Sequence, residues 1–207
     1  MEVLIIEHGA ATVKGPVMFS NCSDSQSGLP VNLTGSPFFF SFGNLFTAVG
    51  CNIRALLTEI GPQVIGCDST CGPYYNQTSI IYGQQINRLC SGKNCCVART
   101  PYRTQVFYPS LETKNESQDS SGCKLTFLAD QNWVAVTNIN NPQVFQGREY
   151  VPLVLAWVMD YKIWKYDPKT MNCKYFLLEN SLTLAYECSC RMGYEGNPYL
   201  GCQVNSA

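Results

Sequence analysis

The sequence is poor in charged residues. Only 14% of its 207 residues are charged, and the formal net charge is -1. This near-neutral balance excludes the strongly basic surface on which nucleic-acid binding depends, and it gives no attraction to a membrane surface. Hydrophobic residues make up 45% of the chain, which is enough for a folded core. Solubility therefore has to come from something other than charge.

The sequence also lacks the residues that most catalytic sites need. His8 is its single histidine, so no positioned Ser–His or Cys–His pair is expected. There is no GxSxG or HExxH motif, no P-loop and no kinase motif. A glycosidase pair of carboxylates cannot be singled out among fifteen acidic residues. We therefore expect no enzyme, with no catalytic, metal-binding or cofactor-binding residues.

No long apolar run is present. The N-terminal stretch has four consecutive apolar residues at 3–6, with acids on both sides, which is not a signal peptide. The longest apolar run, 151–159, is too short to span a bilayer and contains Pro152. We therefore expect a piece of a longer protein, whose export signal and membrane segment lie outside this sequence.

Cysteine, by contrast, is abundant. The spacings are C-x3-C, C-x4-C-C and C-x-C, without any CxxC pair, and histidine ligands are missing. This pattern favours disulfides, typical of an oxidising compartment, over the alternative of a cysteine-only metal site. The twelve cysteines are Cys22, Cys51, Cys67, Cys71, Cys90, Cys95, Cys96, Cys123, Cys173, Cys188, Cys190 and Cys202.

Four N-x-[ST] sequons occur in polar stretches. In a chain with few charges and many cysteines, they predict N-linked glycans that supply the missing solubility. Chance sequons in ordinary loops are the alternative, and Cys22 inside the first sequon makes that site the least certain acceptor. The predicted acceptors are Asn21, Asn32, Asn76 and Asn115.

Short runs rich in Val, Ile, Phe, Tyr and Thr, bounded by turn-forming residues, predict a mainly β fold with long loops, stapled by disulfides. Residues 53–60 are expected to form one or two helical turns, and 113–122 a solvated loop. The expected strands cover 37–42, 44–51, 62–67, 79–83, 104–108, 124–129, 132–139 and 151–158. Pro152 places the last of these at a strand start or a sheet edge.

One segment combines positive charge with aromatic residues. The 43 residues between Asp68 and Glu112 contain no acid. A polyanionic sugar would need cations for its carboxylates and aromatic faces for its rings, while the alternative is a simply solvated charge run. The candidate ligand residues are Arg88, Lys93, Arg99, Arg103 and Tyr102. A weaker candidate cluster consists of Lys162, Lys165, Lys169 and Lys174, interleaved with Trp164 and Tyr166.

The cysteine contexts, taken in order, resemble the extracellular region of plant wall-associated receptor kinases and their kinase-like relatives. The resemblance covers nearly all of residues 17–202, and GYEGNPYL is its most specific part. It rests on SPFFFSFGNLFTAVGCN, VIGCDSTC, LCSGKNCC, GCKLTFLAD, VPLVLAWVMD and YECSCRMGYEGNPYLGC.

The resemblance implies three parts. Residues 1–16 would be the remnant of an N-terminal galacturonan-binding module, 17–172 the β-rich ectodomain, and 173–207 a partial EGF-like segment. In that ending we expect Cys190 to pair with Cys202 and Cys173 with Cys188, with Gly193 and Gly196 in tight turns. The pairing of the other eight cysteines stays open.

The implied function is non-catalytic recognition outside the cell, at the plasma membrane in the parent protein. Pectic polysaccharide (polygalacturonate) is the expected ligand, and the parent receptor would be a Ser/Thr kinase whose kinase domain is not in this chain. The alternatives are an ectodomain fragment that contacts an extracellular protein, or a secreted cysteine-rich protein, neither binding sugar itself.

Overall fold

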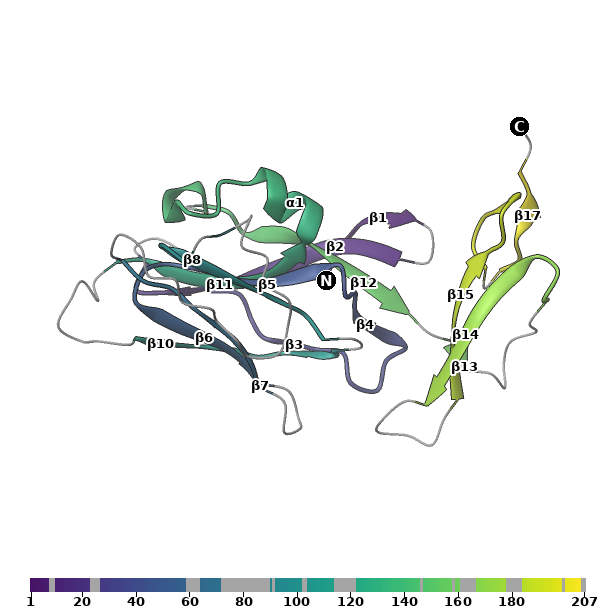
Figure 1. The fold of residues 1–207 in the computed structure, drawn as a ribbon, viewed down its shortest axis with the longest axis horizontal. Helices are drawn as coiled ribbons and strands as arrows, with labels where there is room; N and C mark the ends of the chain where they lie inside the picture. The colour runs from purple at the N-terminus through teal and green to yellow at the C-terminus, as the bar shows by residue number, and fades with distance from the viewer. Residues whose placement is uncertain are drawn as a thin grey trace.

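The computed structural model describes residues 1–7, 10–22, 27–58, 64–71, 90, 92–101, 104–113, 122–145, 147–157, 159–160, 167–177, 184–198 and 200–205. Strands dominate this part of the chain (Figure 1), and all twelve cysteines form disulfides. The prediction of a mainly β, disulfide-stapled chain is therefore confirmed. With every cysteine bridged, none is left as a thiolate ligand for a metal.

The largest sheet is antiparallel and contains seven strands. Its central residues are apolar on both faces: all six residues of β5 are buried, because each face of this sheet is covered by another layer. The order is β4 (Phe38–Phe40), β12 (Tyr150–Trp157), β2 (Ala10–Ser20), β11 (Lys124–Asp130), β5 (Asn44–Val49) and β8 (Cys95–Arg99), and β1 (Val3–Glu7) pairs with β2. The expected boundary at residue 16 falls inside β2. The division into 1–16, 17–172 and 173–207 stays a prediction.

A smaller antiparallel sheet covers one face. It consists of β10 (Pro109–Thr113), β6 (Ile53–Thr58) and β7 (Val64–Asp68). The expectation of a helix at 53–60 is wrong. Ile53, Ala55 and Leu57 are fully buried while Arg54 is exposed, and this period of two belongs to a half-buried strand.

The core between the two sheets is aromatic and aliphatic. Phe46 of β5 and Phe107 of β9 (Val106–Phe107) meet edge to face at 6.3 Å, and residues of β6 and β7 complete the cluster. β9 pairs with β3 (Val31–Asn32), which brings the 31–38 segment to the side of this core. Each fully buried Leu or Phe contributes about 1.5–3 kcal/mol to folding, so this layer is a main source of stability.

The other face of the large sheet is covered by α1 (Gln131–Val136) and the 3-10 turn η1 (Pro142–Phe145). A strand was expected at 132–139, and this is wrong. The Asp130 side chain accepts a hydrogen bond from the Asn132 backbone N–H at 3.0 Å and caps a helix. A strand would place Val134 and Val136 on the same face, yet Val134 is 1% exposed and Val136 85%.

The remaining expected strands find counterparts in β4, β5, β7, β9, β11 and β12, and residues 79–83 lie outside the described part, as does most of the 113–122 loop. Pro152 is the third residue of β12 and pairs there with β2 alone, because β4 pairs with β12 only from Leu155 to Trp157; it therefore lies near the strand start at a locally open edge, as expected. Among the described residues, no helix has the length and apolar character needed to cross a membrane.

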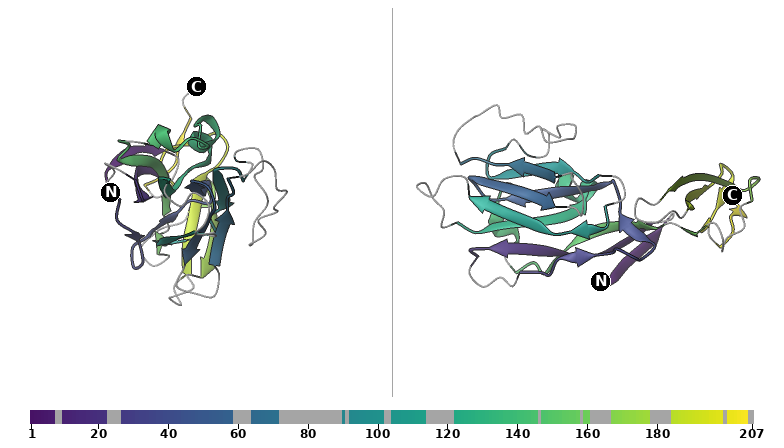
Figure 2. Two further views of the ribbon diagram at one scale, coloured as in Figure 1. Left: turned by 90° about the vertical axis from the view of Figure 1, so that its left-hand side faces the viewer. Right: turned by 90° about the horizontal axis from the view of Figure 1, so that it is seen from below.

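The C-terminal strands form a unit that lies apart from the two sheets (Figures 1 and 2). β14 (Met171–Leu177) pairs with β15 (Leu184–Cys190), which also pairs with β13 (Met159–Asp160). β16 (Tyr194–Glu195) and β17 (Gln203–Val204) form a two-stranded ending. Its buried surface is small, so disulfides have to supply much of its stability.

Candidate functional site

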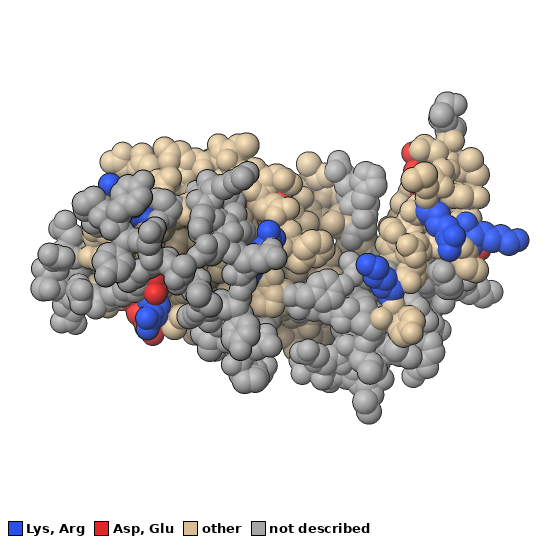
Figure 3. Space-filling view, viewed as in Figure 1, with Lys and Arg blue, Asp and Glu red and all other residues tan. Residues whose placement is uncertain are grey.

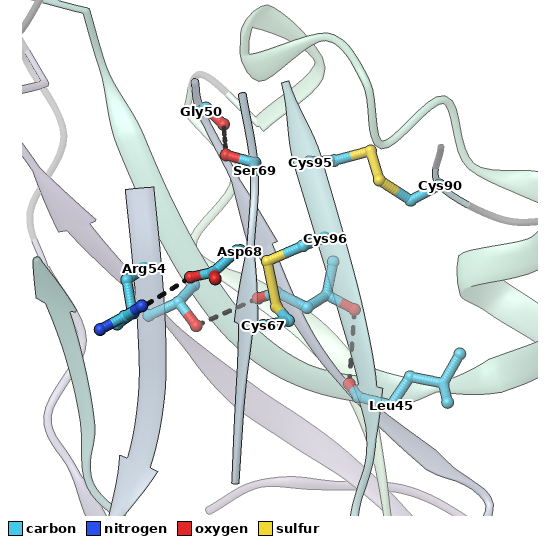
Figure 4. Close-up of a disulfide and its surroundings, with 11 residues drawn as sticks. Leu45, Gly50, Arg54, Cys67, Asp68, Ser69, Cys90, Cys95 and Cys96 are labelled. Atoms are coloured by element: carbon cyan, nitrogen blue, oxygen red, sulfur yellow. Dashed lines mark hydrogen bonds and ion pairs between the residues drawn. A yellow bond between two sulfur atoms is a disulfide. The ribbon is translucent and has the colours of Figure 1, made fainter. Parts of the chain in front are cut away.

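The adjacent Cys95 and Cys96 point to opposite faces of the large sheet, because successive side chains of a strand alternate. Cys96 enters the core between the sheets and bonds to Cys67 of β7, which staples the small sheet to the large one (Figure 4). Cys95 enters the core beneath α1 and bonds to Cys90. One dipeptide therefore fixes both faces of β8.

A third disulfide, Cys51–Cys71, closes the same end of the two sheets. The turns here are joined by short backbone hydrogen bonds: the Gly50 N–H donates to the Asn94 carbonyl, and the Thr70 N–H to the Gly92 carbonyl, each at 2.8 Å. The Ser69 hydroxyl donates to the Gly50 carbonyl at 2.6 Å. Residues 50–52, 69–71 and 92–96 thus form one rigid surface, which we call the cysteine-rich end.

The cysteine-rich end presents Lys93, a predicted ligand residue, to solvent. Arg99, also exposed, lies at the other end of β8, opposite Leu45. From Cys95 to Arg99 alone β8 extends roughly 13 Å, and Lys93 lies before its start, so the two cations do not form one cluster. The other predicted ligand residues, Arg88, Tyr102 and Arg103, lie outside the described residues.

The charge near β8 is less one-sided than the sequence indicated. On the neighbouring small sheet, Arg54 Nε lies 3.2 Å from Asp68 Oδ1, and the two form an exposed ion pair. Within the described part of the chain, neither of the two ion pairs includes Lys93 or Arg99. These two cations are therefore available to an external anion, whereas Arg54 is neutralised.

A second positively charged surface lies on the C-terminal unit, where blue side chains gather in Figure 3. Lys169, Lys174 and Arg191 are exposed there. The Arg191 N–H donates to the Thr170 carbonyl at 2.9 Å, and its Nε donates to the Met171 carbonyl at 3.0 Å. Pairing of β14 with β15 thus brings Arg191 next to residues 169–171.

Arg191 was missed by sequence reasoning, because it lies more than twenty residues from Lys169 in the chain. Lys174 of the predicted cluster is exposed on β14. Lys162, Lys165, Trp164 and Tyr166 of the predicted cluster lie outside the described residues. Lys169 and Lys174 of the predicted cluster, together with Arg191, therefore make up this surface among the described residues.

The disulfides of the C-terminal unit join Cys173 to Cys188 across β14 and β15, and Cys190 to Cys202. These are the two pairs named from the sequence. Gly193 and Gly196 have φ of 87° and 108°, a conformation that favours glycine, at the two turns around Tyr194. These four cysteines thus have the partners that the resemblance implied.

Two of the four predicted glycan acceptors are described, and both are exposed. Asn21 follows β2, has φ of 55° and precedes Cys22, which bonds to Cys123. Asn32 ends β3 in a hydrogen-bonded turn. Asn76 and Asn115 lie outside the described residues, as does His8.

Comparison with known proteins identifies the group to which these features belong. Residues 87–166 match the family described as "Wall-associated kinase". The matched segment contains β8, α1 and β12. Three Arabidopsis thaliana proteins match over almost the whole chain. Wall-associated receptor kinase-like 1 and wall-associated receptor kinase-like 3 are 33% and 32% identical to it, each over 94% of this chain. Wall-associated receptor kinase-like 5 is 31% identical over 96% of this chain. The chain is similar to wall-associated receptor kinase-like proteins over almost its whole length.

The chain spans 29% of the length of each of these three wall-associated receptor kinase-like proteins. It matches their extracellular region and not their kinase domain. No solved structure matches this chain. The wall-associated kinase match includes Lys93 and Arg99 but ends before Lys169 and Arg191.

Proposed function

We propose that this chain is a non-catalytic recognition region that binds pectic polysaccharide, with polygalacturonate as the ligand. The observation that carries the proposal is that several exposed cations form no ion pair with any other described residue, among them Lys93, Arg99, Lys169 and Arg191. Their wide spacing suits an extended polymer with repeated carboxylates better than a single sugar. The names of the relatives, which are wall-associated, support an acidic wall polymer as that ligand.

The cysteine-rich end gives the proposal a physical basis. Lys93 stands on a surface held by three disulfides, so little conformational entropy is lost by the backbone when it binds a carboxylate. Arg99 lies at the far end of β8 and offers bidentate hydrogen bonds to a second carboxylate. Arg88, Arg103 and Tyr102 belong to the same acid-free segment and are included in the proposed surface.

The C-terminal unit is proposed to be the closing part of an EGF-like segment, covering residues 173–207. Its support is the pair of disulfides 173–188 and 190–202 and the glycine turns at 193 and 196. Residues 1–16 and 17–172 are proposed as the end of a preceding module and the main ectodomain. The parent protein would place all three outside the plasma membrane, with glycans on Asn21, Asn32, Asn76 and Asn115.

A binding assay on immobilised polygalacturonate tests the proposal. The secreted chain is expected to bind polygalacturonate and to lose binding when the carboxylates are methyl-esterified, because the cations then have no anion to pair with. The variants Lys93→Gln/Arg99→Gln and Lys169→Gln/Arg191→Gln should each weaken binding several-fold. Arg54→Gln is the matched control, since it removes an exposed charge that Asp68 already neutralises.

The competing function is an ectodomain that contacts another extracellular protein and binds no sugar itself. Its support is the exposed apolar strand β1, where Val3, Leu4, Ile5 and Ile6 are all at least 40% exposed. Equal binding of esterified and unesterified pectin, or no binding at all, would reject polygalacturonate as the ligand. Contact with another extracellular protein would then be the remaining function.

A further inference from the structure

A hollow of about 660 Å³ lies where the segment before β3 meets the N-terminal ends of β1 and β12 and the middle of β2. It is a shallow hollow that is open to solvent. It is distant in sequence from every cation of the proposed polysaccharide surface. Its lining includes Lys14, Leu29, Pro30, Asn32, Glu149 and Tyr150.

The hollow has apolar walls that the described residues leave uncovered. Leu29 is 81% exposed and Tyr150 37%. The Lys14 ammonium lies 4.6 Å from the centre of the Tyr150 ring and 2.8 Å from Glu2 Oε2. Glu2 neutralises Lys14, and Glu149 adds a negative charge to the lining. A polyanion is therefore disfavoured here, and a neutral ligand with apolar faces is favoured.

Asn32 is held at the rim of this hollow in a fixed orientation. Val31 and Leu33 pack against the core, so the alternation of the strand turns the Asn32 side chain outward. Asn32 Oδ1 accepts the Thr34 backbone N–H at 2.9 Å. The Asn32 Nδ2 amide has no acceptor among the described residues, and it is the atom that carries a glycan in an Asn-Leu-Thr sequon.

The segment that carries Asn32 is anchored on both sides. The Leu33 N–H donates to the Gln105 carbonyl at 2.8 Å. The Gln105 side-chain amide in turn donates to the carbonyls of Leu33, Ser36 and Phe38. A group attached to Asn32 therefore has a fixed starting point beside Leu29 and Tyr150.

We propose that Asn32 carries an N-linked glycan whose first sugars lie in this hollow and cover Leu29, Pro30 and Tyr150. The proposal needs an extracellular chain but not polysaccharide binding. Attachment requires a lipid-diphosphate-linked oligosaccharide as donor. Asn32 Nδ2 forms a bond to C1 of the terminal N-acetylglucosamine, the C1–O bond to the diphosphate breaks, the lipid diphosphate leaves, and Nδ2 gives up one proton.

The chemistry of the hollow matches N-acetylglucosamine. This sugar is neutral, its ring C–H groups and acetamide methyl group pack on apolar side chains, and its hydroxyls donate to a carboxylate such as that of Glu149. Covering the exposed side chains also removes apolar surface that would otherwise favour association. The glycan therefore acts as a part of the folded surface, in addition to supplying solubility.

Occupancy is tested first, on the full chain secreted from plant cells. Release with an amidase that tolerates core fucose, in heavy-oxygen water, converts each glycosylated Asn to labelled Asp. We expect the label at Asn32 in peptide mass spectra, and its loss in Thr34→Ala, which keeps the asparagine but removes the sequon. An unlabelled Asn32 would overturn the proposal, whether or not the chain binds polygalacturonate.

The position of the glycan is tested second. Enzymatic removal of the glycan from the folded protein should raise amide hydrogen exchange at 29–33 and 149–151, without change in β5 or β11. Endoglycosidase should release the Asn32 glycan several-fold faster from Leu29→Ser and Tyr150→Ala than from the unchanged chain. Leu29 is exposed, so its variant should fold even if the Tyr150 variant does not. Unchanged amide hydrogen exchange, together with equal rates of glycan release, would show that the first sugars do not lie in the hollow.

Discussion

Asn44 and Val154 form a two-way hydrogen bond: Asn44 Nδ2 donates to the Val154 carbonyl at 2.7 Å, and the Val154 N–H donates to Asn44 Oδ1 at 2.9 Å. β5 and β12 are not neighbours in the sheet, because β2 and β11 lie between them in the strand order. Asn44 is fully buried, and its carbonyl also accepts the Thr100 hydroxyl. The Asn44 side chain thus joins β5 and β12, two strands that are not paired with each other in the sheet.

Replacement of Asn44 by Ala should lower the free energy of unfolding by about 1–3 kcal/mol, because the Val154 N–H loses its partner, whereas the Val154 carbonyl keeps the Ser41 N–H. Denaturant unfolding with the disulfides intact measures this. Asn141→Ala is the control: the Asn141 side chain accepts a single N–H, that of Gln143, at an exposed turn, so we expect less than about 1 kcal/mol. Equal losses in the two variants would show that the Asn44–Val154 bond is not a major contributor.

The opposite orientations of Cys95 and Cys96 predict a definite connectivity. Mass spectrometry of a non-reduced digest with partial reduction should find Cys67–Cys96 and Cys90–Cys95. The exchanged pairs, Cys67–Cys95 and Cys90–Cys96, would require β8 to turn over and would contradict the fold. Every side chain of the strand would then change faces.

The same two bridges should differ in their contribution to stability. The Cys67–Cys96 bridge closes a 29-residue separation and the Cys90–Cys95 bridge a separation of five. From the chain entropy of the unfolded state, replacing both cysteines by alanine should cost about 3–4 kcal/mol for the first pair and about 2 kcal/mol for the second. Chemical denaturation of the two double variants measures the difference, and the reverse order would contradict this reasoning.

The close approach of β2 to β12 predicts that Gly15 cannot accept a side chain. A Cβ atom at Gly15 would lie 2.7 Å from Leu153 Cβ and 3.3 Å from the Val151 carbonyl oxygen. Gly15→Ala should therefore destabilise the fold by about 1–3 kcal/mol. Gly122→Ala is the matched control, since its Cβ would meet no atom within 4 Å.

A lower unfolding temperature for Gly15→Ala than for Gly122→Ala is the expected observation. Combining Gly15→Ala with Leu153→Gly should give a loss smaller than the sum of the two single changes, because Leu153→Gly removes the Cβ atom that the new methyl group would meet at 2.7 Å. Strictly additive losses would mean that the strain at Gly15 lies in the backbone and not in this contact.

The sequence predicted the fold class and most strands because β-branched and aromatic runs were bounded clearly by turn residues. It failed where propensity and tertiary context disagree. The Ala, Leu and Glu residues of 53–60 favour a helix, yet the alternation of Ile53, Ala55 and Leu57 gives them one buried face in a sheet. At 132–139 a run of β-formers is helical at its start, where Asp130 caps the helix and Val134 and Trp133 pack into the core.

The candidate site was predictable only in part, for a different reason. Lys93 and Arg99 were found because they lie in one acid-free segment, but the strand between them sets them far apart, which sequence proximity conceals. Arg191 lies beside Lys169 only because β14 and β15 pair. The hollow at Asn32 draws its lining from the starts of β1 and β12 and from the 29–33 segment, and no linear pattern indicates it.

Ionic strength gives the most direct test of how polygalacturonate would bind. The proposed contacts are exposed ion pairs, which salt screens: the Debye length falls from about 10 Å at 0.1 M to about 3 Å at 1 M. Affinity measured at 0.05 M and 0.5 M salt should therefore fall at least about tenfold. Lys93→Gln/Arg99→Gln should show a smaller fall, because fewer charges take part, whereas Arg54→Gln should keep the full salt dependence. A salt-independent affinity would mean that apolar contacts, and not these cations, hold the polymer.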